Sequence, residues 1–252
     1  MIDKSEVACR FRRSVESYDE NAHVQKAIVS RFMTLLKTYC PTTPGRILEI
    51  GCGTGLLTAR ICRRYKENKL YVNDLVEAMC NKTARRCQLP KQHCLSGDIE
   101  QIALDGNFSL IVSASTFQWL SDLQRTFRRL DYHLQEKGWL LFSTFGTDNY
   151  NELRTITGNG LSYRRLSEMK DLLSEFFDVV YSEECHHTLY FDNPFQVLQH
   201  IKKTGVNAVS TQQNWCRSMI DDFVKEYAAR FEEDGHVTLT YHPQYFVCHK
   251  RY

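Results

Sequence analysis

Gly45-Arg-Ile-Leu-Glu-Ile-Gly-Cys-Gly-Thr-Gly-Leu-Leu-Thr-Ala-Arg60 is the stretch that decides the fold. Residues 46–50 are rich in branched apolar side chains, which favours a buried parallel strand. Gly51, Gly53 and Gly55 follow at every second position, and a helical pattern begins directly after them. Glycine allows a tight turn and lets a ligand approach the main chain, because it has no Cβ. The stretch therefore predicts a strand, a glycine-rich turn and a helix N-terminus, an arrangement typical of nucleotide binding.

The glycine spacing separates this turn from two common phosphate-binding loops. The dinucleotide fingerprint is G-x-G-x-x-G, whereas this chain has G-x-G-x-G with Glu49 two places before the first glycine. No Lys-Ser/Thr pair follows the turn, which excludes a P-loop. A glycine-rich turn that binds no ligand is the alternative, and the agreement of spacing with context argues against it.

The pattern E-x-G-x-G-x-G resembles the first motif of class I S-adenosylmethionine-dependent methyltransferases. The resemblance implies that the glycines lie against the methionine and ribose portions of S-adenosylmethionine. It also implies that a nearby carboxylate meets the cationic groups of this ligand. The fold class that follows is α/β: a Rossmann-like, mostly parallel, doubly wound sheet, with N-terminal helices and a helical insertion that forms a lid.

The rest of the chain alternates between helical and strand patterns, which fits a doubly wound sheet. Residues 1–40 look helical, and only Gln25 interrupts their apolar stripe, so Gln25 either makes a buried hydrogen bond or faces a ligand. Residues 146–162 look like a loop. We expect further strands at residues 70–73, 92–95, 108–113, 138–145, 177–180, 187–191 and 237–241, and helices at residues 56–65, 123–134, 163–176, 194–204 and 215–231.

We expect one methyltransferase domain over residues 1–252. Its predicted parts are an N-terminal helical cap (1–44), a core that binds S-adenosylmethionine (45–146), an acceptor-side insertion with helices (147–235) and C-terminal strands (236–252).

Composition limits the compartment and the partners. The 32 lysines and arginines nearly balance the 30 aspartates and glutamates, which argues against a general polyanion binder. The chain has no apolar run long enough to cross a membrane and no signal-peptide pattern. Its ten cysteines form no C-x-x-C pair, and the adjacent His186 and His187 would face opposite sides of a strand. We therefore expect a protein of the reducing cytoplasm that binds no nucleic acid, no membrane and no metal.

Acidic residues follow two of the predicted strands, where an open α/β sheet binds its ligand. Asp74 ends the second strand and suits a ribose diol; as an alternative it caps the following helix, and the two roles are compatible. The resemblance to class I methyltransferases places Asp98 against the adenine amino group. The full set of expected cofactor-binding residues is Glu49, Gly51, Gly53, Gly55, Asp74, Leu75, Met79, Asp98, Ile99 and Ser113.

Segments outside the glycine motif are more particular than the motif itself. They are Phe11-Arg-Arg-Ser-Val-Glu-Ser-Tyr-Asp19 with Gln25, Phe117-Gln-Trp-Leu120, Thr144-Phe-Gly146 with Glu152-Leu-Arg154, His200-Ile-Lys-Lys-Thr-Gly-Val-Asn-Ala208, and Leu239-Thr-Tyr-His242 with Lys250. Together and in this order they resemble the malonyl-[acyl-carrier-protein] O-methyltransferase family of biotin biosynthesis, over nearly the whole chain.

That family resemblance implies a reaction. The free carboxylate of a malonyl thioester attacks the sulfonium methyl group of S-adenosylmethionine, giving a methyl ester and S-adenosylhomocysteine. A carboxylate is already ionised at pH 7, so no general base is required. The catalytic task is to align the carboxylate oxygen with the methyl–sulfur bond and to exclude water from both.

Five residues are the candidates for positioning the acceptor. Tyr18 either hydrogen-bonds the carboxylate, closes over the donor, or packs as a core aromatic. Gln118 and Trp119 follow the fourth strand, at the rim of the ligand crevice. Lys202 either pairs with the malonyl carboxylate or extends from a helix edge into solvent, and Arg154 is the alternative cation. Tyr163 and His242 are weaker candidates.

The implied partner is an acyl-carrier protein bearing malonyl-phosphopantetheine. Carrier proteins are strongly acidic, so a basic docking surface is expected. Arg10 to Arg13, Arg128-Arg129, Arg164-Arg165 and Lys202-Lys203 are available, and each is equally consistent with a solvated helix face. We expect a monomer.

Three other functions are the alternatives to this one. A methyltransferase acting on another small carboxylic acid is the nearest alternative, and a non-catalytic methyltransferase-like assembly protein is the second. The intact set of Glu49, three glycines and Asp74 argues against the second. A nucleic-acid methyltransferase is disfavoured by a net charge of only +2 and by the lack of an N/D-P-P-Y/W motif after the fourth strand.

Overall fold

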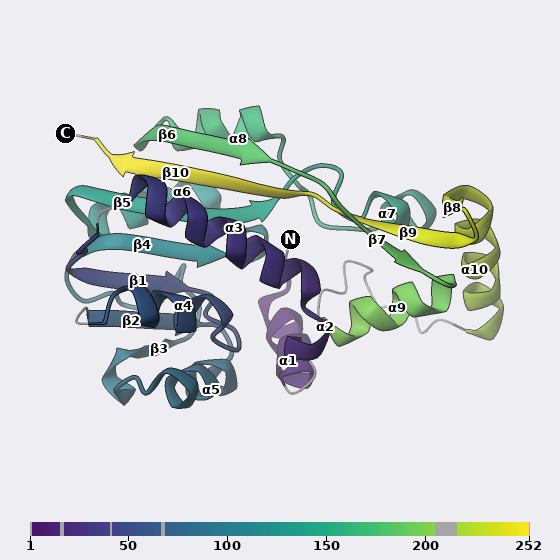
Figure 1. Ribbon diagram of the computed structural model, residues 1–252, viewed down its shortest axis with the longest axis horizontal. Helices are drawn as coiled ribbons and strands as arrows, with labels where there is room; N and C mark the ends of the chain where they lie inside the picture. Colours follow the sequence, from purple (N-terminus) through teal and green to yellow (C-terminus); the bar gives the residue numbers. More distant parts are fainter. Residues whose placement is uncertain (1, 16–17, 41, 67–68, 205–215, 252) are drawn as a thin grey trace.

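The computed structural model describes residues 2–15, 18–40, 42–66, 69–204 and 216–251 of the chain. Its architecture is α/β. A seven-stranded sheet carries helices on both faces, and a three-stranded sheet with helices of its own lies at one end (Figure 1).

Helices and strands alternate through the first half of the chain. The helices are α1 (Lys4–Ser14), α2 (Tyr18–Asn21), α3 (His23–Tyr39), α4 (Leu56–Arg64), α5 (Glu77–Cys87), α6 (Leu123–His133), α7 (Asn151–Thr157), α8 (Leu166–Leu173), α9 (Pro194–Lys203) and α10 (Arg217–Phe231), with 3-10 turns η1 (Lys91–His93) and η2 (Phe117–Trp119). The strands are β1 (Arg46–Ile50), β2 (Lys69–Asp74), β3 (Cys94–Ser96), β4 (Phe108–Ala114), β5 (Leu134–Phe145), β6 (Phe177–Glu184), β7 (His187–Phe191), β8 (Glu232–Glu233), β9 (His236–Tyr241) and β10 (Pro243–Lys250).

The large sheet has the strand order β3-β2-β1-β4-β5-β10-β6. The first five strands pair in parallel, and β10 runs antiparallel between β5 and β6. This topology confirms the predicted Rossmann-like, mostly parallel, doubly wound sheet. It brings the carboxyl ends of β1, β2 and β4 together at one edge, where ligands bind in folds of this kind.

The inner strands β1, β4 and β10 of the large sheet are mostly buried on both faces. Ile47 belongs to one hydrophobic cluster together with side chains of α3 and α4, while the next residue, Leu48, belongs to a second cluster with side chains of α6 and α8. Successive strand residues point to opposite faces, so β1 needs apolar side chains at nearly every position. Four of its five residues are buried.

One long ribbon joins the two sheets. β9 pairs with β7 in the small sheet, and β10 continues from it into the large sheet (Figure 1, yellow). The predicted C-terminal strands therefore belong to different sheets. The segment predicted as the acceptor-side insertion also supplies β6 to the large sheet and β7 and β8 to the small one, besides its helices.

The prediction of a loop over residues 146–162 was wrong, because α7 lies within it. Both carboxylate oxygens of Glu152 accept hydrogen bonds from Thr240, one from the backbone N–H (3.1 Å) and one from the hydroxyl (2.6 Å). These contacts join parts of the chain that are 88 residues apart, so no local pattern signals them. Leu153 beside it is fully buried, which further stabilises the helix against β9.

Most other expected boundaries differ by a few residues. The helix expected over 163–176 begins only at Leu166. The third strand, expected at 92–95, covers Cys94–Ser96, directly after η1. The strands expected at 138–145 and 177–180 are longer, since β5 begins at Leu134 and β6 extends to Glu184. Among the helices in the described part of the chain, none has the length and apolar character needed to cross a membrane.

Candidate active site

The glycine turn after β1 is held in a conformation that depends on glycine. The N–H groups of Gly51 and Cys52 both donate to the carbonyl oxygen of Asn73, at 2.8 and 2.9 Å. Gly51 has a φ of +72°, and a Cβ there would lie 2.0 Å from Oγ1 of Thr116. Gly53 also has a positive φ (+52°), but no atom lies within 4 Å of a Cβ placed on it. The turn is therefore packed on one side and open at Gly53.

A pocket lies over this turn, lined by the glycine turn and by residues at or after the carboxyl ends of β2, β3 and β4. We call it the glycine-loop pocket. Seven of the ten predicted cofactor-binding residues line it: Gly51, Gly53, Asp74, Leu75, Met79, Asp98 and Ile99. Gly55 and Ser113 lie outside this lining. Gly55 precedes α4 with a φ of +87°, and the Ser113 hydroxyl donates to the Ile50 carbonyl oxygen at 2.8 Å.

Asp74 connects the glycine turn to the segment that leads into α5. Its Oδ2 accepts a hydrogen bond from the N–H of Gly53 at 2.9 Å, and its Oδ1 accepts one from the N–H of Val76 at 2.8 Å. The predicted helix cap was wrong in detail, since Val76 precedes α5 and this bond closes a turn before the helix. Burial raises the pKa of Asp74 to about 6. The carboxylate still lines the pocket, so a ligand hydroxyl can reach it.

Glu49 faces a smaller cavity that shares Gln25, Gly51 and Gly53 with the glycine-loop pocket. Glu49 is 1% exposed, and within the described part of the chain its Oε2 has no hydrogen-bond partner. Burial raises its pKa to about 8. Gln25 is also buried, and its Oε1 has no hydrogen-bond partner among the same residues. Two acceptor oxygens facing one cavity fit a ligand group that carries positive charge and N–H donors.

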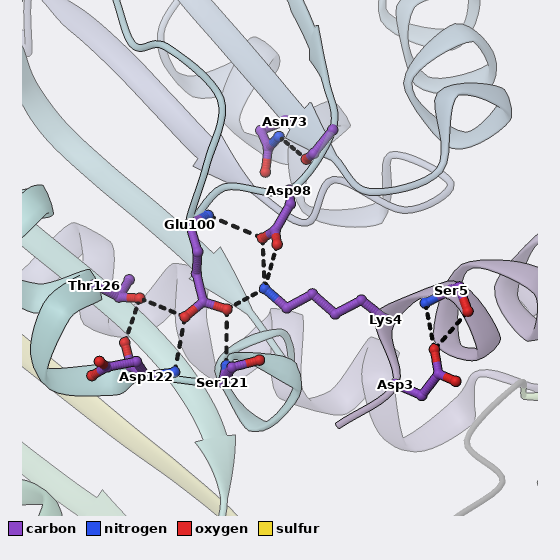
Figure 2. A network of polar contacts seen from close by, with 10 residues as sticks. Asp3, Lys4, Ser5, Asn73, Asp98, Glu100, Ser121, Asp122 and Thr126 are labelled. Carbon is purple, nitrogen blue, oxygen red and sulfur yellow. Dashed lines mark hydrogen bonds and ion pairs between the residues drawn. The ribbon is translucent and has the colours of Figure 1, made fainter. Parts of the chain in front are cut away.

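Asp98 forms an ion pair that the sequence does not reveal. The ammonium of Lys4 lies 2.7 and 2.6 Å from the two carboxylate oxygens of Asp98, and it also pairs with Glu100 (Figure 2). Lys4 lines the glycine-loop pocket, although it lies 94 residues from Asp98 in sequence. Helical periodicity predicted a helix near Lys4, but it carries no signal for where the side chain goes.

Another pocket, called the second pocket below, adjoins the glycine-loop pocket. It lies between α1, η2 and residues 159–164. The two pockets share Val7, Gln118, Trp119, Leu120 and Phe145. Gln118 and Trp119 therefore lie at the junction, at the carboxyl end of β4 as expected. The Gln118 amide is fixed there by a hydrogen bond to the Ser115 carbonyl oxygen at 2.7 Å.

The other three acceptor candidates are placed differently. Tyr18 begins α2, but its side chain lies outside the described residues. Lys202 is exposed on α9 and lines neither pocket. Arg154 donates to the Thr147 carbonyl oxygen and lies 5.7 Å from the ring centre of Tyr163, which lines the second pocket. Arg154 thus supports the pocket wall from behind.

Two cations that were considered only for docking do line the second pocket. They are Arg10 of α1 and Arg164, which precedes α8. Glu6 lies in the same wall and pairs with Arg10, so this part of the pocket carries both signs of charge.

His186 and His242 form a cluster with Asp148, outside both pockets. His186 Nε2 lies 3.0 Å from Asp148 Oδ2, and this hydrogen bond holds the pKa of Asp148 below its usual value. Burial lowers the pKa of His242. The imidazole rings are stacked with centres 4.2 Å apart and an angle of 21° between their planes. The three groups offer ligand atoms within 4.8 Å of one another, so the expectation that the chain binds no metal stays a prediction.

Comparisons with known proteins agree on one enzyme class. A family model described as "Methyltransferase domain" matches residues 47–138. Proteins named malonyl-[acyl-carrier protein] O-methyltransferase from Bacteroides thetaiotaomicron and Acinetobacter baylyi are each 36% identical to the chain. The first alignment covers 99% of this chain and 99% of the relative, and the second covers 99% and 98%.

Solved structures share the fold at low sequence identity. The N-methyltransferase NodS from Bradyrhizobium japonicum, solved with S-adenosyl-L-homocysteine, has a TM-score of 0.55 at 15% identity, over 98% of this chain and 100% of its own. The YcgJ protein from Bacillus subtilis has a TM-score of 0.60 at 15% identity, over 88% of this chain and 98% of its own. Similarity at this identity supports the architecture alone.

Proposed function

Because the chain belongs to the malonyl-[acyl-carrier protein] O-methyltransferase family, we propose that it methylates the free carboxylate of a malonyl thioester with S-adenosylmethionine. The thioester is the one formed with the phosphopantetheine arm of an acyl-carrier protein, and the reaction is an early step of biotin synthesis. The observation that carries this proposal is the junction of two pockets at Gln118 and Trp119, one of them built on the glycine turn.

The glycine-loop pocket fits the methyl donor. Its open surface at Gly53 lets a ligand lie against the main chain, where any side chain would intrude. The carboxylate of Asp74 accepts hydrogen bonds from the ribose hydroxyl groups. Glu49 and Gln25 supply acceptor oxygens for the ammonium group of the methionine portion, which would satisfy the unpaired Glu49 oxygen.

The second pocket receives the malonyl thioester. The carboxylate oxygen forms a bond to the methyl carbon while the carbon–sulfur bond breaks, and the electron pair remains on sulfur. No proton moves, because the acid is already ionised at pH 7. The chain's task at the junction is to hold the oxygen in line and keep water out, and the apolar side chains of Val7, Leu120 and Phe145 suit this role.

The second pocket offers cationic side chains to an anionic acceptor, although Asp3 and Glu6 also line it. Arg10 and Arg164 line its walls and can orient the malonyl carboxylate or the phosphate of the phosphopantetheine arm. The pairing of Lys202 with the malonyl carboxylate stays a prediction, since the segment that follows α9 is outside the described residues. The monomeric state, the cytoplasmic location and the absence of metal and nucleic acid also stay predictions.

The test is an assay of S-adenosylhomocysteine formation with four acceptors: malonyl-carrier protein, malonyl-coenzyme A, succinyl-carrier protein and free malonate. Turnover of the malonyl thioesters, with the other two slower by about 100-fold or more, is the expected result. Equal turnover of free acids would favour a methyltransferase for another small carboxylic acid. Donor binding without turnover of any malonyl compound would overturn the proposal.

A further inference from the structure

Lys4 is the only cationic side chain that lines the glycine-loop pocket within the described part of the chain. It extends from the first turn of α1 to Asp98 and Glu100, in the loop after β3 (Figure 2). The side chains of Lys4, Asp98 and Glu100 are only 20%, 14% and 10% exposed. An ion pair at this depth is screened by solvent far less than one on the surface.

Glu100 extends this contact to the rim of the second pocket. Its carboxylate oxygens accept hydrogen bonds from the N–H groups of Ser121 (2.9 Å) and Asp122 (2.8 Å), directly after the junction residues (Figure 2). Burial opposes its charge, but the hydrogen bonds from Lys4, Ser121 and Asp122 hold the pKa of Glu100 below its usual value. One ammonium thus compensates two carboxylates that would otherwise repel each other.

α1 forms a wall of both pockets. Val7, one turn after Lys4, is 8% exposed and lines the two pockets together. One turn further, the ring of Phe11 meets the junction residue Trp119 edge-on, with ring centres 5.7 Å apart and an angle of 88°. Residues one turn apart share a helix face, so a contact that fixes Lys4 also fixes Val7 and Phe11.

We propose that Lys4 is a positioning residue that holds α1 against both pockets, through Asp98 on the donor side and Glu100 on the acceptor rim. The same helix then forms a wall of both pockets, which couples binding of the two substrates. The coupling rests on the proposed function, whereas the role of Lys4 in donor binding needs only the donor. Lys4 itself takes no part in the chemical step.

The test compares Lys4→Met and Lys4→Arg with the control Lys37→Met, which replaces an exposed lysine on α3. We expect Lys4→Met to weaken S-adenosylhomocysteine binding by about 10-fold, measured by calorimetry. Amide hydrogen exchange over residues 4–14 should rise by about 10-fold in the same complex. Lys4→Arg should stay within about 3-fold of the wild type in both measurements, because it keeps the charge.

Kinetics separate positioning from a general loss of structure. With saturating donor, Lys4→Met should raise the KM for malonyl-carrier protein by about 5-fold and change kcat by less than about 2-fold. Unchanged donor affinity together with unchanged exchange of α1 would overturn the proposal, as would an equal effect of Lys37→Met. If the wild type binds S-adenosylhomocysteine but methylates no malonyl thioester, the proposed function fails, and the binding and exchange measurements still decide the role of Lys4.

Discussion

The carboxylate of Asp74 accepts a hydrogen bond from the backbone N–H of Gly53 at 2.9 Å. This bond joins the end of β2 to the glycine turn after β1, so the two walls of the glycine-loop pocket are fixed by one side chain. Its second oxygen is held by the N–H of Val76 at 2.8 Å. Asp74 therefore shapes the pocket even before it meets a ligand.

Replacing Asp74 by asparagine should damage both the turn and ligand binding. An amide offers one acceptor oxygen in place of two, so either Gly53 or Val76 would face an NH₂ group. We expect S-adenosylhomocysteine to bind about 30-fold more weakly and the melting temperature to fall by about 3 °C. Calorimetry and thermal unfolding measure the two effects. Asp171→Asn, an exposed position on α8, should change neither; affinity retained in Asp74→Asn would contradict the assigned role.

Glu49 is predicted to favour binding at the expense of stability. Its pKa of about 8 in the folded protein lies above the ordinary value of 4.5. The folded state therefore holds a proton that the unfolded state releases, and stability falls as the pH rises from 4.5 to about 8. Glu49→Gln has no proton to retain, so at pH 8 it should gain on the order of 2 kcal/mol in the free energy of unfolding, with a smaller gain at pH 5.

The same substitution should weaken donor binding by about 10-fold or more, because the ammonium loses its anionic partner. Binding of S-adenosylhomocysteine to the wild type at pH 7 should release up to about one proton, since the cation favours the ionised form of Glu49. Calorimetry in buffers of different ionisation enthalpy measures this release. Glu49→Gln should release none, and the exposed control Glu136→Gln should behave as the wild type. Proton uptake on binding to the wild type would refute this role of Glu49.

Gly51→Ala tests the steric requirement of the turn. The new Cβ would lie 2.0 Å from Oγ1 of Thr116, and the backbone φ of +72° is itself unfavourable for alanine. We expect a loss of about 3 kcal/mol or more in the free energy of unfolding, and little donor binding. Gly158→Ala is the matched control, because its φ is +65° but nothing lies within 4 Å of its Cβ. It should cost about 1 kcal/mol, as backbone strain alone does; equal losses would show that Thr116 yields to the methyl group.

How far the sequence predicted this site depends on how local each signal is. Glu49 and Asp74 lie at the carboxyl ends of β1 and β2, and Gly51 and Gly53 follow β1 directly. The apolar patterns of these strands are plain, and parallel pairing brings their ends together. The place of Gln118 at the pocket junction was predictable for the same reason, because Gln118 follows β4 and β4 pairs in parallel with β1. The helix of Lys4 was predictable, but its contact with Asp98 depends on how α1 packs against the sheet, and no periodicity encodes that. α7 was missed similarly, because Glu152 is held by a strand far along the chain.

Trp119 should matter for the acceptor more than for the donor. It lies at the pocket junction and packs against Phe11, so Trp119→Phe keeps an aromatic ring but loses the indole N–H and part of the wall. We expect kcat/KM for malonyl-carrier protein to fall by about 30-fold, and S-adenosylhomocysteine affinity to change by less than about 3-fold. Trp139→Phe, on β5 beside His249 and outside both pockets, is the control and should be nearly silent. A larger effect on donor affinity than on kcat/KM would place Trp119 in the donor site.

Docking of an acidic carrier protein should make the reaction sensitive to salt. Arg164 and Arg165 are exposed beside the second pocket, and Arg12 and Arg13 are exposed at the end of α1. Exposed charges attract a partner over a distance of about 8 Å at physiological ionic strength, and added salt shortens that distance. Raising the salt from about 50 to 300 mM should therefore lower kcat/KM for malonyl-carrier protein by about 10-fold, mainly through KM.

Malonyl-coenzyme A presents no acidic protein surface, so its kcat/KM should fall by less than about 3-fold over the same range. Replacing Arg12, Arg13 and Arg165, which line neither pocket, together with glutamine should remove part of the salt dependence seen with the carrier protein. An equal response of both acceptors to salt would mean that the enzyme recognises only the malonyl-phosphopantetheine arm, and that the basic residues are solvated helix faces.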